Sequence, residues 1–248
     1  MKLVVGLGNP GKKYERTRHN AGFWLIERFA AQTGTVLRKD AKFQALVGRH
    51  APTGAWLLLP QGFMNSSGRP VQMLASFFRI SPAEILVVHD ELDFAPGVAR
   101  IKQGGGIAGH NGLKDISARL GSHDYWRLRI GIGHPGDRQA VTDFVLHKPS
   151  QEEQAEIDAA IGRALEVLPL ALGGDLQGAM LKLHTQEKAQ EKVRTAEPAA
   201  EPAKADKPEK AAPAPAAANT GPIEKTGKTE KASALKSLFK KFLPDTKK

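Results

Sequence analysis

The alternation of apolar and polar positions along the chain predicts a domain built from alternating strands and helices. Short apolar runs bounded by glycine, proline or polar residues predict buried strands, and apolar positions three and four residues apart predict helices. The expected strands are 2–7, 45–49, 56–60, 85–89, 98–102 and 126–132, and the expected helices are 21–32, 71–78, 112–120 and a long one that follows residue 150. We therefore expect the α/β class, with a single domain in which a twisted mixed β-sheet lies between helices.

The long helix has a well-marked start. Ser150 and Glu153 have the spacing of a capping box, in which each side chain bonds the backbone N–H of the other residue. Pro169 lacks a backbone N–H, so we expect it to kink or end this helix.

The composition of the chain changes near residue 187, and we expect the domain to span residues 1–187. Residues 188–232 are mostly Ala, Pro, Lys, Glu and Thr. A segment with so few large aliphatic side chains cannot bury enough apolar surface to offset its ordering entropy, so we expect a disordered linker. Residues 233–243 form a separate segment after the linker, and we expect residues 244–248 to be a short tail.

Residues 233–243 differ from the linker because their apolar side chains fall on one face of a helix. These side chains are Leu235, Leu238, Phe239, Phe242 and Leu243, and Lys236, Lys240 and Lys241 lie off that face. Such a short basic amphipathic helix suits docking on an anionic surface or on an undefined partner. The segment is also short for a helix that is stable alone, so both interpretations stay open.

Composition and charge exclude some functions and favour others. The chain has 248 residues and no cysteine, which excludes disulfides and thiolate metal sites and fits a reducing cytoplasm. No signal peptide and no apolar stretch of about 18 residues is evident, so we expect a cytoplasmic protein. The formal net charge of +10 makes a polyanion such as RNA a plausible partner. Residues 186–248 contribute half of this charge, so a basic patch on the domain depends on particular residues.

Two glycine-rich loops raise the question of a phosphate site. Residues 6–11 match G-x-G-x-x-G after the first strand, but Pro10 disfavours a helix start there and Asp40 lies too far along to bind a ribose. We therefore predict a turn rather than a dinucleotide site. Residues 104–109 precede a helix, which suits either an anion site or a flexible connection. Arg100 and Lys102 on the preceding strand favour the anion site.

Signatures of metal or nucleophilic catalysis are absent from the sequence. No pair of histidines four residues apart on a helix predicts a zinc hydrolase, and no G-x-S-x-G predicts a serine nucleophile. Hydrolysis would therefore need water activated by a base. Eight histidines are candidates, and periodicity does not choose among them.

Five blocks of residues resemble motifs of bacterial-type peptidyl-tRNA hydrolases, in the order and spacing of that family. They are Gly6-Leu7-Gly8-Asn9-Pro10-Gly11 with Tyr14 and Thr17-Arg18-His19-Asn20-Ala21-Gly22, Phe63-Met64-Asn65 with Ser67-Gly68, His89-Asp90-Glu91-Leu92-Asp93, residues 104–106 with Gly109-His110-Asn111-Gly112-Leu113, and Gly131-Ile132-Gly133-His134-Pro135. The resemblance extends from residue 3 to about residue 185. It implies hydrolysis of the ester that joins a peptide to the 3′ end of tRNA.

The resemblance also implies catalytic roles for single residues. His19 is the general base, and Asp90 orients its ring and stabilises the imidazolium. Asn9, Asn65 and Asn111 hold the peptide backbone and place the water or the developing oxyanion, since each amide offers a donor and an acceptor.

Further residues are implied to bind the substrate. Tyr14 and Met64 line the cleft, Lys102 and Arg129 clamp the 5′ phosphate of the acceptor stem, and Arg100 and Lys114 extend the clamp. Phosphate contacts carry no sequence information, which suits an enzyme that accepts most elongator tRNAs. The expected partner is peptidyl-tRNA, the expected state is a monomer, and no cofactor or metal is implied.

An RNA-binding protein of the same fold without catalysis, like the splicing-factor relatives found in chloroplasts, is the alternative, because fold alone does not fix function. The four residues that discriminate are Asn9, His19, Asp90 and Asn111, and all are present. Two positions depart from the family pattern: Gly62 stands where a threonine is frequent, and Arg100 replaces a lysine.

Overall fold

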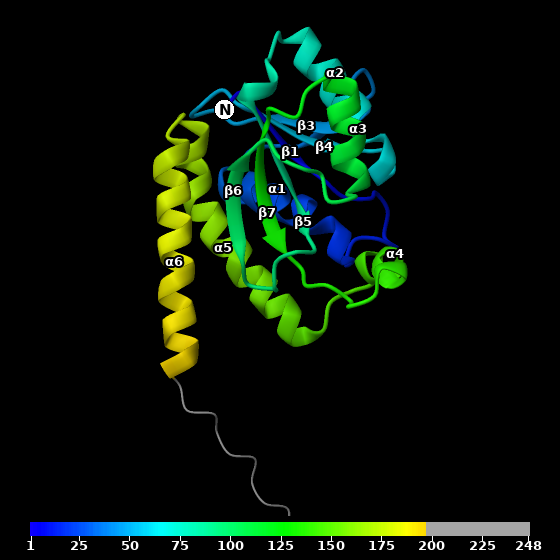
Figure 1. Cartoon of the computed structure of the whole chain (residues 1–248). Coiled ribbons are helices and arrows are strands. Elements are labelled where there is room, and N and C mark those ends of the chain that lie inside the picture. Colours follow the sequence, from blue (N-terminus) through cyan, green and yellow to red (C-terminus); the bar gives the residue numbers. More distant parts are fainter. Residues whose placement is uncertain (197–248) are drawn as a thin grey trace, which may run out of the picture. The chain divides into compact units, whose positions relative to one another are not determined.

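Seven strands form one sheet in the order β2-β3-β4-β1-β5-β7-β6 in a computed structural model of the chain, which describes residues 1–196 (Figure 1). The strands are β1 Leu3–Gly6, β2 Arg38–Asp40, β3 Ala45–Arg49, β4 Trp56–Pro60, β5 Ile85–Glu91, β6 Ala99–Gln103 and β7 Trp126–Gly131. The helices are α1 Ala21–Gln32, α2 Gly68–Phe77, α3 Asn111–Leu120, α4 Val141–Val145, α5 Gln151–Leu172 and α6 Leu176–Ala196. Short 3₁₀ segments cover Arg18–Asn20, Met64–Ser66, Pro82–Glu84 and Arg138–Ala140.

The middle of the sheet is parallel and its edges are antiparallel. β1 pairs in parallel with β4 and β5, and β5 pairs in parallel with β7. β2 and β3 form an antiparallel edge beside β4, and β6 runs antiparallel to β7. This is the expected mixed sheet. Its parallel strands all end on the same side of the sheet, and the loops that follow their carboxyl ends are where α/β folds bind ligands.

Two layers of helices cover the sheet, and successive strand residues alternate between them. Val4 and Leu86 pack with residues of α1, α5 and α6, whereas Leu3 and Val5 pack with residues of α2 and α3. β1 is apolar at consecutive positions because both faces are buried, as is typical of a parallel strand. Full burial of each such side chain stabilises the fold by about 1.5–3 kcal/mol.

Gly22 lets the first turn of α1 contact the sheet. A Cβ atom at this position would lie 2.3 Å from the carbonyl oxygen of Val88 and 2.6 Å from that of Leu7. The backbone N–H of Phe23 donates to the Leu7 oxygen at 3.1 Å, which ties the helix to the end of β1. Because His19 directly precedes this helix, the close approach holds His19 against the ends of β1 and β5.

Most predicted elements are confirmed, and the differences have local causes. α2 begins at Gly68 rather than at residue 71, because Pro70 lies in the first turn, where its missing N–H is not needed. Pro169 does not end α5, which continues to Leu172. The apolar pattern does not predict β2 or α4, because β2 is polar and largely exposed and α4 has five residues.

α6 continues past residue 187, where we expected the domain to end and a disordered linker to begin. The helix runs to Ala196, which corrects that expectation for residues 188–196. Lys, Glu, Gln and Ala in this stretch are strong helix formers that can extend a helix whose first turns are packed. The remaining linker, the helix predicted at 233–243 and the tail lie outside the described residues. No helix within residues 1–196 is long and apolar enough to cross a membrane.

Candidate active site

A cleft of about 720 Å³ opens at the carboxyl ends of the parallel strands. Its size is typical of pockets that bind small ligands or parts of larger ones. Its walls come from loops far apart in the sequence: Asn9 and Tyr14 after β1, His19 before α1, Met64 and Asn65 after β4, Asp90 in β5, and His110 and Asn111 at the start of α3. The fold therefore brings together the residues assigned from sequence to catalysis and peptide binding.

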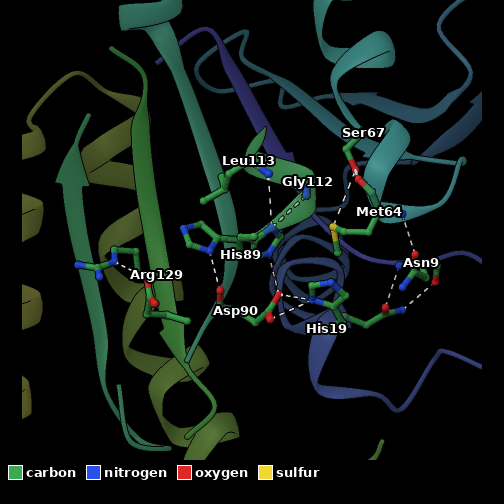
Figure 2. Close-up of polar contacts among 12 residues, drawn as sticks. Asn9, His19, Met64, Ser67, His89, Asp90, Gly112, Leu113 and Arg129 are labelled. Atoms are coloured by element: carbon green, nitrogen blue, oxygen red, sulfur yellow. Dashed lines mark hydrogen bonds and ion pairs between the residues drawn. The ribbon is translucent and has the colours of Figure 1, made fainter. Parts of the chain in front are cut away.

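His19 and Asp90 form the buried centre of the cleft, and Figure 2 shows the Asp90 carboxylate facing the His19 ring. Nδ1 of His19 lies 2.9 Å from Oδ1 and 3.0 Å from Oδ2 of Asp90, and the two residues are 8% and 3% exposed. A carboxylate at Nδ1 selects the tautomer with its proton on that nitrogen, so Nε2 carries a lone pair. Nε2 has no hydrogen-bond partner within residues 1–196, which leaves it available as a base in the cleft.

His110 donates a second hydrogen bond to the same carboxylate. Its Nε2 lies 3.1 Å from Oδ1 of Asp90, and its Nδ1 accepts from the backbone N–H groups of Gly112 at 3.1 Å and Leu113 at 3.4 Å. A nitrogen that accepts cannot carry the proton of a neutral ring, so Nε2 carries it and donates to Asp90. Sequence reasoning missed His110 as a site residue, although it lies in the same motif as Asn111.

The charges in this group shift pKa values in opposite directions. Burial lowers the pKa of His19, but the negative charge of Asp90 and its hydrogen bond outweigh burial and raise that pKa above 6.5. Burial raises the pKa of Asp90, but its interactions and hydrogen bonds with the rings of His19 and His110 outweigh burial and hold that pKa well below its ordinary value. Burial lowers the pKa of His89 to about 3. Near neutral pH, Asp90 is therefore ionised and His89 is neutral.

His19, Asp90 and His110 are also a group that could supply three metal ligands, among the residues that the structure describes. Both histidine nitrogens that face Asp90 are in direct hydrogen-bond contact with it, so no gap separates these atoms. We interpret the group as a hydrogen-bond network. That the chain needs no metal or cofactor stays a prediction.

Asn9 offers the N–H donors of its side-chain amide to the cleft. Its Oδ1 accepts the backbone N–H of Met64 at 2.8 Å, so the side-chain N–H groups remain for a ligand. Asn20 fixes the backbone of Asn9 through two hydrogen bonds, at 2.8 Å to the N–H and 3.0 Å to the carbonyl oxygen. The sequence did not predict that Asn20 supports Asn9, although Asn20 lies in the same motif as His19. The result is a rigid donor suited to a carbonyl oxygen or an oxyanion.

Asn65 and Asn111 are exposed residues that line the cleft, and neither side chain makes a hydrogen bond within the described part of the chain. Their amide groups are therefore available to a substrate. Met64 is buried below them, and a Cβ atom at Gly112 would lie 2.6 Å from its sulfur, so a larger residue there would displace the Met64 side chain. Tyr14 lines the same cleft.

The predicted phosphate clamp lies beside the cleft, on the antiparallel strands β6 and β7. Arg100 is opposite Arg129 and Lys102 is opposite Arg127, so these four cations share one face of the sheet. Nε of Arg129 donates to Oε2 of the buried Glu91 at 2.8 Å. Glu91 lines the cleft and thereby links the clamp to it, a role that sequence reasoning missed.

Arg127 fixes the glycine-rich loop next to the clamp. It is buried and donates to the carbonyl oxygens of Gly104 and, at 2.6 Å, Gly106. The backbone N–H groups at the start of α3 are not free to bind an anion as expected. The side chain of His110 already accepts the N–H groups of Gly112 and Leu113. Lys114 is exposed in the first turn of α3 and does not line the cleft. The expected anion site is therefore corrected for the helix start, and for the strand cations it stays a prediction.

The loop after β1 lacks the helix start that a dinucleotide site requires. No helix begins within residues 6–11, and α1 begins only at Ala21. Gly8 instead makes room for the ring of Phe23, which would lie 2.6 Å from a Cβ atom there. The structure thus agrees with the predicted turn.

The site combines a histidine–aspartate pair among amide groups with a row of cations beside it, at the end of a mixed α/β sheet. This arrangement is that of a hydrolase-type site next to a basic surface. The sequence model described as peptidyl-tRNA hydrolase matches residues 3–192, and the chain belongs to this family.

Relatives and a solved structure agree with this assignment. The chain is 59% identical over 185 residues to the peptidyl-tRNA hydrolase of Thiobacillus denitrificans, covering 75% of this chain and 91% of that one. It is 56% identical over 191 residues to the peptidyl-tRNA hydrolase of Nitrosospira multiformis, covering 76% and 100%. The crystal structure of peptidyl-tRNA hydrolase from Acinetobacter baumannii superposes with a TM-score of 0.72 at 46% identity, covering 74% and 94%.

Proposed function

We propose that this chain hydrolyses the ester bond between a peptide and the 3′ end of tRNA, and so releases free tRNA for reuse in translation. Membership of the peptidyl-tRNA hydrolase family supports the reaction. The geometry of His19 supports the way in which water is activated. Its Nδ1 is held by Asp90, while its Nε2 has no partner within residues 1–196. This observation carries the proposed mechanism.

In the proposed reaction, Nε2 of His19 takes a proton from water as the water oxygen attacks the ester carbonyl carbon. The carbonyl π bond breaks and a tetrahedral oxyanion forms. Asp90 stabilises the imidazolium, and the side-chain N–H groups of Asn9 stabilise the oxyanion. When the intermediate collapses, the bond to the ribose oxygen breaks and His19 returns the proton to that oxygen. The products are a tRNA with a free 3′ hydroxyl and a peptide with a new carboxyl group, which releases its proton to solvent and becomes a carboxylate.

The peptide is bound through its backbone in this proposal. The amides of Asn65 and Asn111 line the cleft with free donors and acceptors, which match the N–H and C=O groups of any peptide. Tyr14 and Met64 complete the wall of the cleft. This arrangement supports binding that does not depend on the peptide sequence.

The RNA is bound through its phosphates. Arg129 and Lys102 are proposed to clamp the 5′ phosphate, with Arg100 and Lys114 at its margin. Glu91 supports this role for Arg129 because it occupies Nε and leaves the terminal guanidinium nitrogens for a phosphate. An exposed cation acts on phosphates through charge, which is consistent with acceptance of most tRNAs.

We further propose a cytoplasmic location, which the lack of cysteine and the location of tRNA in the cell support, and a monomeric state. Docking by the helix predicted at 233–243 also stays a proposal, because that segment lies outside the described residues. A binding protein without catalysis is less consistent with the intact pair of His19 and Asp90.

The test is release of peptide from N-acetyl-aminoacyl-tRNA. His19→Ala is expected to lower kcat by about 10²- to 10⁴-fold, the range for loss of a general base. Its Kd for deacylated tRNA is expected to stay close to that of the unmodified chain. His123→Ala removes an exposed histidine outside the cleft and is the matched control. Near-normal turnover by His19→Ala would contradict the mechanism.

Two further arms separate the reaction from other activities. Free aminoacyl-tRNA, which lacks the blocked amine, measures the preference for a peptide-like substrate. A chelator tests whether a metal acts at His19, Asp90 and His110, the group with three possible ligands. A rate that falls with chelator and returns with a divalent metal would replace the hydrogen-bond interpretation with a metal site.

A further inference from the structure

We propose that a second basic hollow beside the catalytic cleft binds phosphates of the RNA part of the substrate, an inference that rests on the proposed function. The hollow has a volume of about 410 Å³ and lies between the loop after β1 and the segment that joins α4 to α5. Its lining residues are Lys12, Lys13, Glu15, Arg16, Thr17, Leu146, His147 and Lys148, and we call it the basic hollow. It shares no residue with the clamp on β6 and β7.

Positive charge outweighs negative charge in the basic hollow. Lys12, Lys13, Arg16 and Lys148 are exposed, and Glu15 is the one acidic residue among those that line the hollow. Asp143 pairs with the lining residue His147, and Glu153 pairs with Arg18. None of the four cations forms an ion pair with another of residues 1–196, whereas the clamp arginine on β7 is paired with a carboxylate. Unpaired cations gathered on a concave surface produce a positive potential that attracts phosphates.

Arg18 holds the two walls of the basic hollow together. Its backbone N–H donates to the carbonyl oxygen of His147 at 3.1 Å, and Nη1 donates to the carbonyl oxygens of Phe144, His147 and Lys148 at 3.1 to 3.3 Å. Nη2 bonds to Glu153 at 2.7 Å. Arg18 is buried and paired, so it shapes the hollow without adding charge to its surface. A preformed surface loses less entropy when a ligand binds.

The basic hollow meets the catalytic cleft, because Leu146 lines both. Figure 2 shows Arg129 and Asn9 on opposite sides of His19, and the loop of the basic hollow follows Asn9 in the chain. The basic hollow thus adjoins the catalytic cleft at Leu146, and the clamp adjoins the same cleft through Glu91. An RNA with its 3′ end at His19 can contact both groups, whereas neutral amides line the cleft where the peptide is proposed to bind.

The test is the binding of deacylated tRNA by the triple variant Lys12→Gln, Lys13→Gln and Arg16→Gln. Its Kd is expected to rise about tenfold at about 0.15 M salt. The slope of log Kd against log salt concentration is expected to fall by about one to three, because each phosphate contact contributes about 0.7 to 0.9. Titration at several salt concentrations measures both quantities.

Two matched variants show whether the position of the charge matters. The triple variant Arg38→Gln, Lys39→Gln and Lys182→Gln removes the same formal charge from exposed residues on β2 and α6. The variant Lys12→Arg, Lys13→Arg and Arg16→Lys keeps the charge of the hollow and should bind tRNA as the unmodified chain does. Equal losses in the two neutralised variants would show only a long-range field effect and would overturn the proposal.

Deacylated tRNA carries no peptide. Its binding therefore shows whether the hollow binds RNA, as proposed, or an acidic peptide. If tRNA binding is unchanged while KM rises only for peptides with acidic side chains, the hollow binds peptide and the proposal is wrong. The measurement needs no turnover. Failure of the proposed hydrolysis therefore stays distinguishable from failure of this inference.

Discussion

The buried group around Asp90 and the exposed cations of β6, Arg100 and Lys102, are both polar, but they are organised in different ways. Asp90 is 3% exposed, and both of its side-chain oxygens accept hydrogen bonds from histidine rings. Lys102 is exposed and forms no ion pair with another residue of the described part of the chain. A buried charge without partners costs several kcal/mol, whereas an exposed charge loses little when it is unpaired. The buried group therefore has one defined geometry, and the exposed cations can adapt to RNA.

Because of this difference, we expect substitutions in the two regions to have different effects. Changes in the buried group should alter the rate constant and its pH dependence, because they alter protonation and orientation of His19. Changes in the exposed cations should alter affinity and its salt dependence, because screening acts on charges in contact with solvent. Arg129 combines both properties, since it lies near the surface but is paired with the buried Glu91.

The largest effect on turnover is expected from Asp90→Asn, a change in the buried group. An asparagine keeps the shape of the side chain but removes the charge that stabilises the imidazolium, so kcat should fall by about 10²-fold or more. Turnover of N-acetyl-aminoacyl-tRNA under saturating conditions measures this loss. The salt dependence of tRNA binding should stay as in the unmodified chain.

The pH profile of Asp90→Asn is expected to shift in one direction, to lower pH. The base must be unprotonated, so kcat/KM of the unmodified chain rises with pH through the raised pKa of His19. Removing the Asp90 charge leaves burial, which lowers that pKa, so the acidic limb of the profile should move to lower pH. An acidic limb that stays in place would show that another group than His19 controls the rate.

Sequence patterns predicted the parts of the fold that depend on burial. The helix at 21–32 and the strands at 45–49 and 56–60 have the observed bounds, because a periodic apolar face is a direct consequence of packing. β2 and α4 are too short or too polar to leave such a pattern.

The pairing of His19 with Asp90 was expected from the sequence, whereas the supporting residues His110, Asn20 and Glu91 and their hydrogen bonds were not. Motif resemblance selected His19 and Asp90, and the fold places them in contact across 71 residues of sequence. The tautomer of His110 and the use of Asn9 Oδ1 by Met64 depend on contacts between distant loops. Residue type and periodicity do not specify which atom of a side chain meets which partner, so these features required the structure.

A smaller effect is expected at His110, where two variants separate its two roles. His110→Asn can keep an acceptor for the N–H groups at the start of α3 but loses the donor to Asp90. More of the Asp90 charge then acts on His19, so its pKa should rise and the acidic limb should move to higher pH. We expect kcat/KM near neutral pH to fall by about two- to tenfold, since less of the base is unprotonated.

His110→Gln is the matched variant, because its longer side chain can donate to Asp90 but no longer caps α3 in the same way. Its pH profile should stay close to that of the unmodified chain, while the free energy of unfolding should fall by about 0.5–2 kcal/mol, the usual value of a helix cap. Denaturant unfolding and pH–rate profiles of both variants provide the measurements. Identical pH profiles for the two variants would contradict separate roles.

The smallest effect is expected from Lys102→Gln, which removes one exposed cation from the clamp. The KM for peptidyl-tRNA should rise by a few-fold, and the slope of log Kd against log salt concentration should fall by about one, because one phosphate contact is lost. Lys182→Gln on α6 is the control for loss of one exposed charge. The pH profile should not move, because Lys102 does not touch the group around Asp90. A shift of that profile would mean that the exposed cations and the buried group are coupled, and the comparison between them would fail.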